Sequence, residues 1–343
     1  MSKPCFVLSK SKLLNQYNKI KEIAGNVSYS VKTNHIVAQV LESETDSQFT
    51  IHSTRYLDII KDKSRVWFVG QAWTEDDLEM LFQKGIRSFI VDNEKDMETV
   101  IHYLSGKNAK VNLLLRMKMK EYTIRTERHF VFGMYSKQIN ELIPKLRKNA
   151  NVQKLGIHFH RKTENISEWA LKEELEDVVS EETLKSIDII NIGGGLPVNY
   201  KNYTIDNYDY IFGKIKEFKE WVDGFGIQVF AEPGRFIAAP CIKLETEIIA
   251  IYENNIIVNC SVYNSAMDTF VTHMRLLVED ELENQGEKFT IKGFTPDSMD
   301  VFRYRVYLNS PKIGDKIIFL NAGAYTYSTD FLSLEKPETI IVE

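Results

Sequence analysis

A short apolar strand followed by an amphipathic stretch of helical period recurs along residues 28–235 of this 343-residue chain. Apolar residues at every second position indicate strands, and apolar residues three or four apart indicate helices. Eight strands are predicted in this region, at 28–34, 48–53, 65–70, 87–93, 111–117, 154–160, 187–195 and 227–234. Eight strands that alternate with helices favour an α/β fold, a TIM-like (β/α)8 barrel. An open doubly wound sheet is the alternative, although the early GxGxxG turn typical of it is absent.

The pattern changes after Pro240, where strands follow one another with turns between them. The predicted strands are 241–253, 255–263, 289–295, 301–308, 315–323 and 338–343. They indicate an all-β domain, which an N-terminal strand within residues 1–9 joins. We therefore predict a barrel over residues 10–238 and a β-sandwich or β-barrel domain over residues 239–343.

Composition excludes several classes of function. The formal net charge is -5 and no basic block occurs, so neither nucleic acid nor an anionic membrane surface is an expected partner. No apolar run has the length of a membrane span, and the N-terminus lacks the apolar stretch of a signal peptide. The three cysteines are far apart and form no CxxC pair, which favours a reducing compartment over disulfides or zinc. We expect a cytoplasmic protein.

Reactive residues follow the predicted barrel strands. Chemistry in a (β/α)8 barrel gathers at the carboxyl ends of the strands. The residues at these ends are Lys32, His52, Asp92, Arg116, His160, Gly193, Gly194, Gly195 and Glu232. A buried ammonium group is energetically costly. A lysine at the end of an otherwise apolar strand is therefore expected either to pair with an opposite charge or to take part in chemistry.

Three of these motifs indicate a ligand, although each also fits a plainer role. The three glycines leave backbone N–H groups for an anion, or form a flexible turn. Glu232 and Arg235 flank a Pro-Gly turn, which by itself fits a surface ion pair. His158 and His160 share one face of a strand, but no third ligand follows at a spacing typical of a metal site. Together with the lysine, these residues fit pyridoxal 5′-phosphate (PLP), whose aldehyde forms an imine with lysine.

The chain resembles the PLP-dependent decarboxylases of the alanine-racemase-like fold, which are fold type III PLP enzymes. This family includes ornithine, diaminopimelate, viral arginine and carboxynorspermidine decarboxylases. The resemblance rests on five motifs in the order of the family, which are SVKTN, GIHFH, INIGGGLP, AEPGRF and NAGAYTYS, between residues 28 and 328. The architecture of the family, a barrel plus a β domain, agrees with the pattern described above.

The resemblance implies roles for individual residues. Lys32 would be the Schiff-base lysine, His160 would stack on the pyridine ring, and Glu232 would bind the ring nitrogen. The residues implied in binding the cofactor, including its phosphate, are Arg116, Thr163, Gly193, Gly194, Gly195, Gly234, Arg235 and Tyr325. Asp297 is implied as a catalytic residue that reaches the cofactor of a partner subunit, so a homodimer with shared active sites is expected. A carboxylate beside the ring nitrogen keeps the nitrogen protonated, which favours decarboxylation over racemisation.

The chain departs from the family pattern around the substrate. Pro296 stands where the family has a cysteine thought to control protonation of the product carbanion. Thr50 replaces an acidic residue, and Thr272 or His273 occupies the position at which ornithine decarboxylases hold the distal amine. We therefore expect a substrate other than plain ornithine, an amino acid or amino-acid-bearing metabolite of a biosynthetic or tailoring pathway.

Basic residues near the same positions, Arg161, Lys162, His273 and Arg275, fit either a more acidic or larger substrate or a solvated face. Two other functions stay open. One is a non-catalytic regulatory homologue that binds PLP, and the other is a PLP-dependent racemase or transaminating variant.

Overall fold

The computed structural model describes residues 2–119, 132–326 and 329–343. The chain divides into two compact units. The barrel unit comprises Tyr17–Leu196 and Asn207–Pro233, and the β unit comprises Met1–Gln16, Pro197–Asp206 and Gly234–Glu343. The predicted boundary between residues 238 and 239 stays a prediction.

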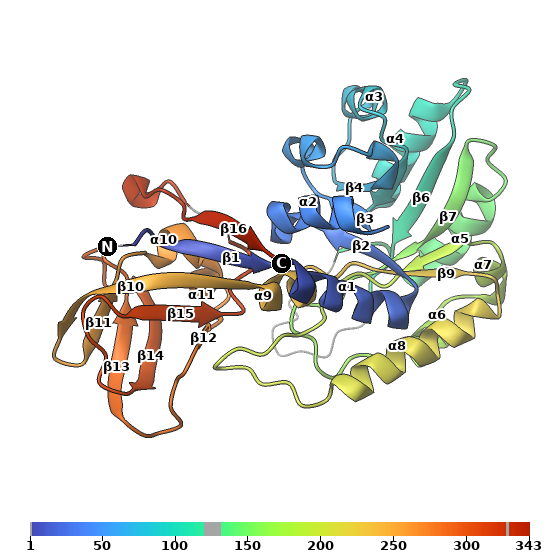
Figure 1. The fold of residues 1–343 in the computed structure, drawn as a ribbon. Coiled ribbons are helices and arrows are strands. Elements are labelled where there is room, and N and C mark those ends of the chain that lie inside the picture. The colour runs from blue at the N-terminus through green and yellow to red at the C-terminus, as the bar shows by residue number, and fades with distance from the viewer. Residues whose placement is uncertain (1, 120–131, 327–328) are drawn as a thin grey trace. The chain divides into compact units, whose positions relative to one another are not determined.

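Eight parallel strands close into the barrel (Figure 1). They are β2 (Asn26–Ser30), β3 (Gln48–Ile51), β4 (Val66–Gly70), β5 (Ser88–Val91), β6 (Val111–Arg116), β7 (Val152–His158), β8 (Ile189–Asn191) and β9 (Gln228–Ala231). Each strand pairs with the next, and β9 closes the barrel by pairing with β2. The predicted (β/α)8 barrel is therefore confirmed.

Helices connect the barrel strands. They are α2 (His35–Glu44), α3 (Glu75–Gln83), α4 (Glu94–Leu104), α5 (Ser136–Leu146), α6 (Leu171–Val178), α7 (Glu181–Lys185) and α8 (Tyr208–Asp223), and α1 (Lys10–Ala24) precedes them. Side-chain caps begin several of these helices. Thr74 and Asp77 form a capping box at α3, and the Asn34 side chain accepts the N–H groups of Ile36 and Val37 at α2. Such caps satisfy N–H groups that have no partner within the helix.

The barrel interior holds a layer of apolar side chains. Trp67, Ile90, Leu114, Ile189 and Phe230 are buried together, one from each of five strands. Burial of such a side chain contributes about 1.5–3 kcal/mol. The barrel is therefore a packed core, and the chemistry must lie at the strand ends.

Several predicted strands end earlier than expected, and for β2 and β8 hydrogen bonds explain why. Strand β2 ends at Ser30, because Val31–Thr33 form a 3-10 turn that leads into the Asn34 cap of α2. Lys32 therefore lies in this turn, just beyond the strand. Strand β8 ends at Asn191, whose side-chain Oδ1 accepts the N–H of Gly193 at 2.9 Å. Both turns carry residues predicted to be functional.

The β unit contains eight strands in one sheet. They are β1 (Cys5–Ser9), β10 (Ile242–Tyr252), β11 (Asn255–Val258), β12 (Leu277–Val278), β13 (Glu287–Lys292), β14 (Val301–Leu308), β15 (Lys316–Leu320) and β16 (Glu338–Val342). Strand β1 pairs with β10 in antiparallel and with β16 in parallel orientation. The prediction of a barrel followed by a C-terminal β domain is thus confirmed.

Short helices also occur in the β unit, namely α9 (Arg235–Cys241), α10 (Val262–Ser265) and α11 (Met267–Val271). The prediction of a strand over 255–263 was wrong in its second half. Ser261 and Asn264 form a capping box, which begins α10 after β11 has ended at Val258. Local side-chain hydrogen bonds of this kind compete with the strand ladder. In the described residues, no helix combines the length and apolar character needed to cross a membrane.

Candidate active site

The turn that carries Lys32 lies beside the end of β3. Strands β2 and β3 pair in a register that sets Ser28 opposite Gln48 and Ser30 opposite Thr50. Two residues beyond this last pair, the chain reaches Lys32 on one side and His52 on the other. Lys32 lies in the 3-10 turn directly after β2, and His52 directly follows β3. The register therefore brings the lysine and His52 to the same edge of the barrel.

Glu232, which directly follows β9, is the buried centre of a hydrogen-bond network. Its Oε1 accepts the Thr50 hydroxyl at 2.7 Å and the Asn191 side-chain amide at 2.8 Å. Its Oε2 lies 3.2 Å from Nε2 of His158, which is also buried. Thr50, His158 and Asn191 lie in three different strands, and Glu232 directly follows a fourth. The barrel therefore fixes the position of the carboxylate.

The network keeps Glu232 ionised. Burial by itself would raise the pKa of this carboxyl group, but the charge and hydrogen bond of His158 and the hydrogen bond from Thr50 oppose it. The result is a pKa of Glu232 well below its ordinary value. A carboxylate that accepts several hydrogen bonds is stabilised in its charged form. Among the described residues Oε2 has one partner, His158, so it keeps a lone pair for a further donor.

Lys32 is exposed to solvent although protein surrounds it. Desolvation lowers the pKa of Lys32, the charge of Arg116 lowers it further, and the Glu232 carboxylate opposes both. In the part of the chain that the structure describes, its ammonium has no hydrogen-bond partner. A lowered pKa increases the fraction of neutral amine, which is the nucleophilic form of lysine.

His160 is neutral and has a defined tautomer. His160 is exposed at the surface of the unit, yet desolvation by the surrounding protein lowers the pKa of His160 to about 3, with the charge of Arg116 as the next cause. The N–H of Gly194 donates to its Nδ1 at 3.0 Å. The proton of this neutral ring therefore resides on Nε2. A neutral flat ring is suited to packing against another ring.

Arg116, the last residue of β6, is oriented by an acid at the end of the neighbouring strand. Its guanidinium donates to Asp92 at 3.2 Å, and Asp92 also accepts the side-chain amide of Gln71. The guanidinium lies 5.1 Å from the ring centroid of Phe132. Arg116 thus adds a fixed positive charge to the residues around Lys32.

The glycine run after β8 passes very close to neighbouring backbone. A Cβ at Gly193 would lie 2.3 Å from the carbonyl oxygen of Phe159, and one at Gly194 would lie 2.7 Å from that of Glu232. Both distances are too short for any other residue. The N–H groups of Gly193 and Gly194 bind Asn191 and His160, whereas that of Gly195 has no acceptor in the described residues. Of the three glycine N–H groups predicted to bind an anion, only that of Gly195 is therefore unoccupied within the described residues.

Arg161, in the loop after β7, does not lie on a solvated face, which was one of the two positions expected for it. Arg161 is fully buried and donates to Glu174 of α6 at 2.5 Å. It therefore belongs to no solvated face, and its charge is already compensated. Lys162 is half-buried and Thr163 is exposed in the same loop.

Gly234, Arg235, Tyr325 and Asp297 lie in the β unit. The Arg235 side chain is buried, and it makes a two-pronged ion pair with Asp268 and donates to the Tyr200 hydroxyl at 2.9 Å. The Tyr325 ring centroid lies 4.9 Å from this guanidinium. Burial would lower the pKa of Arg235, but Tyr200 and Asp268 outweigh it and raise this pKa. The side chain predicted to hold phosphate is thus engaged by a carboxylate.

Asp297 lies beside an aromatic cluster of the β unit. Its Oδ1 accepts the Tyr263 hydroxyl at 3.0 Å. The Tyr263 ring packs edge-on against Phe331 at 4.8 Å and is tilted against Phe270 at 6.1 Å. Asp300, by contrast, is buried and accepts backbone N–H groups, so its role here is structural. Tyr327 and Ser328, the end of the NAGAYTYS motif, lie outside the described residues.

Several functional contacts were missed from sequence. Thr50 was noted only as a departure from an acid, yet it donates directly to Glu232. Asn191 is the last residue of an apolar strand. Only its place shortly before the three glycines could have marked it in the sequence as a functional residue. Asp268 lies in no motif, and nothing in the sequence signals its pairing with Arg235.

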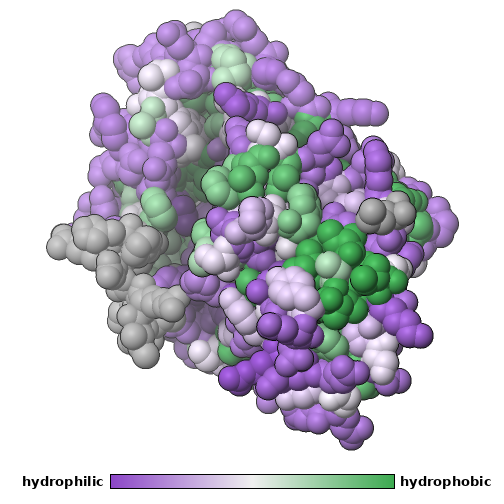
Figure 2. Space-filling view, turned by 90° about the vertical axis from the view of Figure 1, so that its left-hand side faces the viewer, coloured by the Kyte–Doolittle hydropathy of each residue, from purple (hydrophilic) through white to green (hydrophobic). Residues whose placement is uncertain are grey.

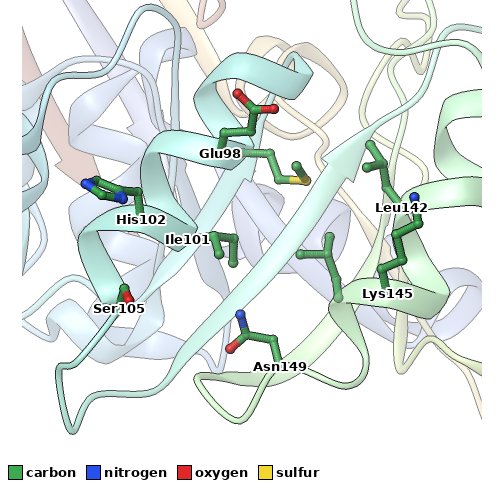
Figure 3. A pocket seen from close by; sticks show the side chains of 9 residues that line it. Glu98, Ile101, His102, Ser105, Leu142, Lys145 and Asn149 are labelled. Carbon is green, nitrogen blue, oxygen red and sulfur yellow. The ribbon is translucent and has the colours of Figure 1, made fainter.

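A hollow lies away from the strand ends (Figure 3). It measures about 490 Å³ and lies between α4 and α5, with Ile101, His102 and Ser105 on one side and Leu142 and Lys145 on the other. These residues come from the C-terminal halves of both helices. In a βα unit the helix runs back toward the start of the strand, so this hollow is at the opposite end of the barrel from Lys32.

A family model described as "Pyridoxal-dependent decarboxylase, pyridoxal binding domain" matches residues 10–239. The chain belongs to this family. The prediction of a PLP-dependent decarboxylase is thereby confirmed at the level of the family, and with it PLP as the cofactor.

Similar proteins cover nearly the whole chain. A diaminopimelate decarboxylase of Methanothermobacter thermautotrophicus is 22% identical over 99% of this chain and 86% of its own length. Antizyme inhibitor 2 of Xenopus laevis is 22% identical over 87% of this chain and 71% of its own. A solved diaminopimelate decarboxylase of M. jannaschi has a TM-score of 0.85 at 19% identity, with 98% of this chain and 86% of that chain covered. This last likeness confirms the alanine-racemase-like fold.

The residues of the barrel unit fit the cofactor of the family. PLP needs an amine for its aldehyde, an acid for its ring nitrogen and donors for its phosphate. Lys32 offers an exposed amine without a hydrogen-bond partner among the described residues, and Glu232 offers an ionised carboxylate with a spare lone pair. The Gly195 N–H offers a donor that is not already used.

Proposed function

We propose that this protein removes the α-carboxylate of an amino acid or amino-acid-bearing metabolite, with PLP bound covalently through Lys32. When bound, PLP supplies an electron sink for the pair of electrons left on the substrate when CO2 departs. The lysine supports this role through its solvent exposure and its lowered pKa.

The ionised Glu232 is the observation that carries the choice of reaction. Thr50, Asn191 and His158 hold this carboxylate in place and in its charged form. A negative charge favours a protonated ring nitrogen, and a protonated ring withdraws electrons strongly. Loss of CO2 is therefore favoured over racemisation.

The remaining barrel residues are proposed to bind and orient the cofactor. His160 offers a neutral ring for stacking, with its Nδ1 fixed by the Gly194 N–H. The glycine run and Thr163 are proposed to contact the phosphate, and Arg116 to add positive charge beneath the ring. The contributions of Gly234, Arg235 and Tyr325 rest on the family resemblance.

The substrate is proposed to differ from plain ornithine. Asp268 is the one acidic residue between positions 262 and 278 of the sequence. Its carboxylate is engaged by Arg235 and by the Thr272 hydroxyl at 2.9 Å. An acid with its charge already compensated is a poor partner for the terminal ammonium of a diamino acid.

We further propose a homodimer in which Asp297 reaches the partner's cofactor. Large apolar side chains are exposed near Asp297 in the β unit, notably Phe270, Phe331 and Leu332. Figure 2 shows hydrophobic side chains gathered on one face of the molecule. Exposed apolar groups of this kind are typical of protein interfaces, and a second copy of this chain is the proposed partner.

The test is a CO2-release screen of purified, PLP-loaded protein with basic, acidic and conjugated amino acids. Borohydride should first fix the cofactor to Lys32, as read by peptide mass. Lys32→Ala should abolish both labelling and CO2 release, whereas Lys185→Ala, which alters an exposed lysine of α7, should change neither.

Three results would overturn the proposal. Labelling of Lys32 without CO2 from any substrate would favour the regulatory homologue. Exchange of the Cα proton in deuterated water without CO2 would favour a racemase. Absence of labelling at Lys32 in protein saturated with PLP would contradict the enzymatic role altogether.

A further inference from the structure

His52 is one of the residues at the carboxyl ends of the barrel strands. The proposed function gives it no role. It directly follows β3, beside the turn of Lys32, in the register that sets Ser30 opposite Thr50. Its ring is influenced by the charges of Lys32, Glu232, His158 and Arg116, so it lies among the residues proposed to bind the cofactor.

The ring of His52 is not engaged by the surrounding protein. His158 has Nε2 at hydrogen-bond distance from Glu232, and His160 has Nδ1 bonded to the Gly194 N–H. His52 makes no hydrogen bond to any residue that the structure describes, and its side chain is exposed. Neither of its nitrogens therefore has a hydrogen-bond partner among the described residues, and the residue is open to water.

The ring of His52 is neutral. Although His52 is exposed, desolvation by the protein around its ring lowers the pKa of His52 to about 3, and the charge of Lys32 is the next cause. A neutral imidazole carries one N–H donor and one acceptor nitrogen. It can therefore release a proton at one nitrogen while it takes up another proton at the second.

The proposed reaction requires such a group. After CO2 leaves, the electron pair on the substrate Cα must take a proton before the amine is released. The family resemblance places Pro296 at the position of the cysteine thought to supply this proton, and proline has no proton to give. Lys32 must meanwhile re-form its link to the cofactor, so a separate proton source spares it from two tasks.

We propose that His52 is a catalytic residue that delivers the proton to Cα. The N–H bond of one ring nitrogen breaks and the Cα electron pair forms the new C–H bond, while the other ring nitrogen takes a proton from water. The net change is one proton moved from solvent to Cα, and no electrons are gained or lost by the protein. This role rests on the proposed decarboxylase function.

The test compares His52→Gln with His102→Gln in the PLP-loaded enzyme. His102 is an exposed histidine of α4, remote from Lys32, and serves as the matched control. General acid catalysis contributes about a hundredfold or more, so kcat of His52→Gln should fall by about that factor. Covalent loading of Lys32 should be unchanged in both variants.

The position and face of protonation give the decisive result. In deuterated water, wild type and His102→Gln should place one deuterium on a single face of Cα. His52→Gln should give mixed stereochemistry, together with more protonation on the cofactor, which leaves the amino group on it and a carbonyl product. Added imidazole should restore single-face deuteration to His52→Ala but should have no effect on His102→Ala.

Several outcomes would overturn the inference. If His52→Gln releases CO2 at the wild-type rate with one-face deuteration, His52 is not the proton donor. If His52→Ala folds and loads PLP but imidazole rescues neither rate nor stereochemistry, its role is structural. If wild type itself releases no CO2, the proposed function fails first, which the screen described above reveals independently.

Discussion

Glu232 illustrates how a buried charge is kept in place at the scale of single residues. Desolvation raises its pKa, yet the charge and hydrogen bond of His158 and the hydrogen bond from Thr50 outweigh that penalty, and Asn191 adds a further hydrogen bond. Removal of one member of such a buried network usually costs more stability than its hydrogen bonds contributed, because the polar groups that remain are left buried without a partner. The network is therefore expected to stabilise the fold as well as to serve the proposed reaction.

Substitution of this carboxyl should change how stability depends on pH. The folded-state pKa of Glu232 lies below its unfolded value of about 4.3, so its contribution is present above that pH and is lost as pH falls toward the folded value. Glu232→Gln in the cofactor-free protein should be destabilised by about 1.5–3 kcal/mol at pH 7. The difference should shrink as pH falls from about 5 to 3.

Urea unfolding of both proteins across this pH range measures the effect. Glu181→Gln, in the exposed Glu181–Lys185 pair of α7, is the control and should shift the free energy of unfolding by under about 0.5 kcal/mol. A difference between wild type and Glu232→Gln that stays constant down to pH 3 would contradict the lowered pKa.

Sequence offers candidate site residues more readily than the contacts between them. Lys32, His160 and Glu232 are candidates because they follow apolar strands, a pattern that is visible locally. The pairing of Arg235 with Asp268 joins two residues 33 positions apart and depends on how α9 and α11 pack. No periodicity in the sequence encodes such a contact.

At the scale of elements, the turn after β8 is determined by close backbone approach. Gly193 has a φ of 66°, and a Cβ there would lie 2.3 Å from the Phe159 carbonyl oxygen. Glycine alone adopts this geometry without strain. The β8 turn therefore requires glycine whether or not a phosphate binds.

Gly193→Ala should accordingly destabilise the fold by about 1–3 kcal/mol and weaken PLP binding, because the turn must shift away from β7.

Gly213→Ala is the matched control. Gly213 lies inside α8 with no atom within 4 Å of a Cβ, so alanine should stabilise the protein by about 0.5–1 kcal/mol. Thermal unfolding and PLP titration measure both variants. Wild-type stability in Gly193→Ala would show that the turn is more adaptable than its geometry indicates.

Element boundaries were the least predictable part of the fold. All eight barrel strands were found, because each carries an apolar run bounded by turn residues. The early end of β2 and the helix α10 were missed because side-chain caps, at Asn34 and Ser261, decide them. Such hydrogen bonds depend on rotamers that the hydrophobic pattern does not reveal.

At the scale of the whole molecule, the proposed sharing of sites between subunits can be tested by mixing. Lys32→Ala and Asp297→Ala should each be inactive alone. If each site takes Lys32 from one chain and Asp297 from the other, a mixed dimer has one intact site. Random exchange of equal amounts should then restore about a quarter of wild-type CO2 release.

Sedimentation and differently tagged subunits establish whether mixed dimers form. Lys32→Ala mixed with Lys185→Ala controls for simple dilution and should give about half of wild-type activity, since Lys185 is remote from the site. Mixed dimers without any recovery would show that Lys32 and Asp297 act within the same chain.

The pairing of β1 with β10 and β16 has a consequence for biosynthesis. Strand β1 hydrogen-bonds with β16, from Cys5 opposite Glu338 to Ser9 opposite Val342, so more than 300 residues of chain separate the two strands. At 5–20 residues per second, a ribosome needs roughly tens of seconds to translate that stretch. All barrel strands are made within this interval, whereas the edge of β1 that pairs with β16 stays open until β16 emerges.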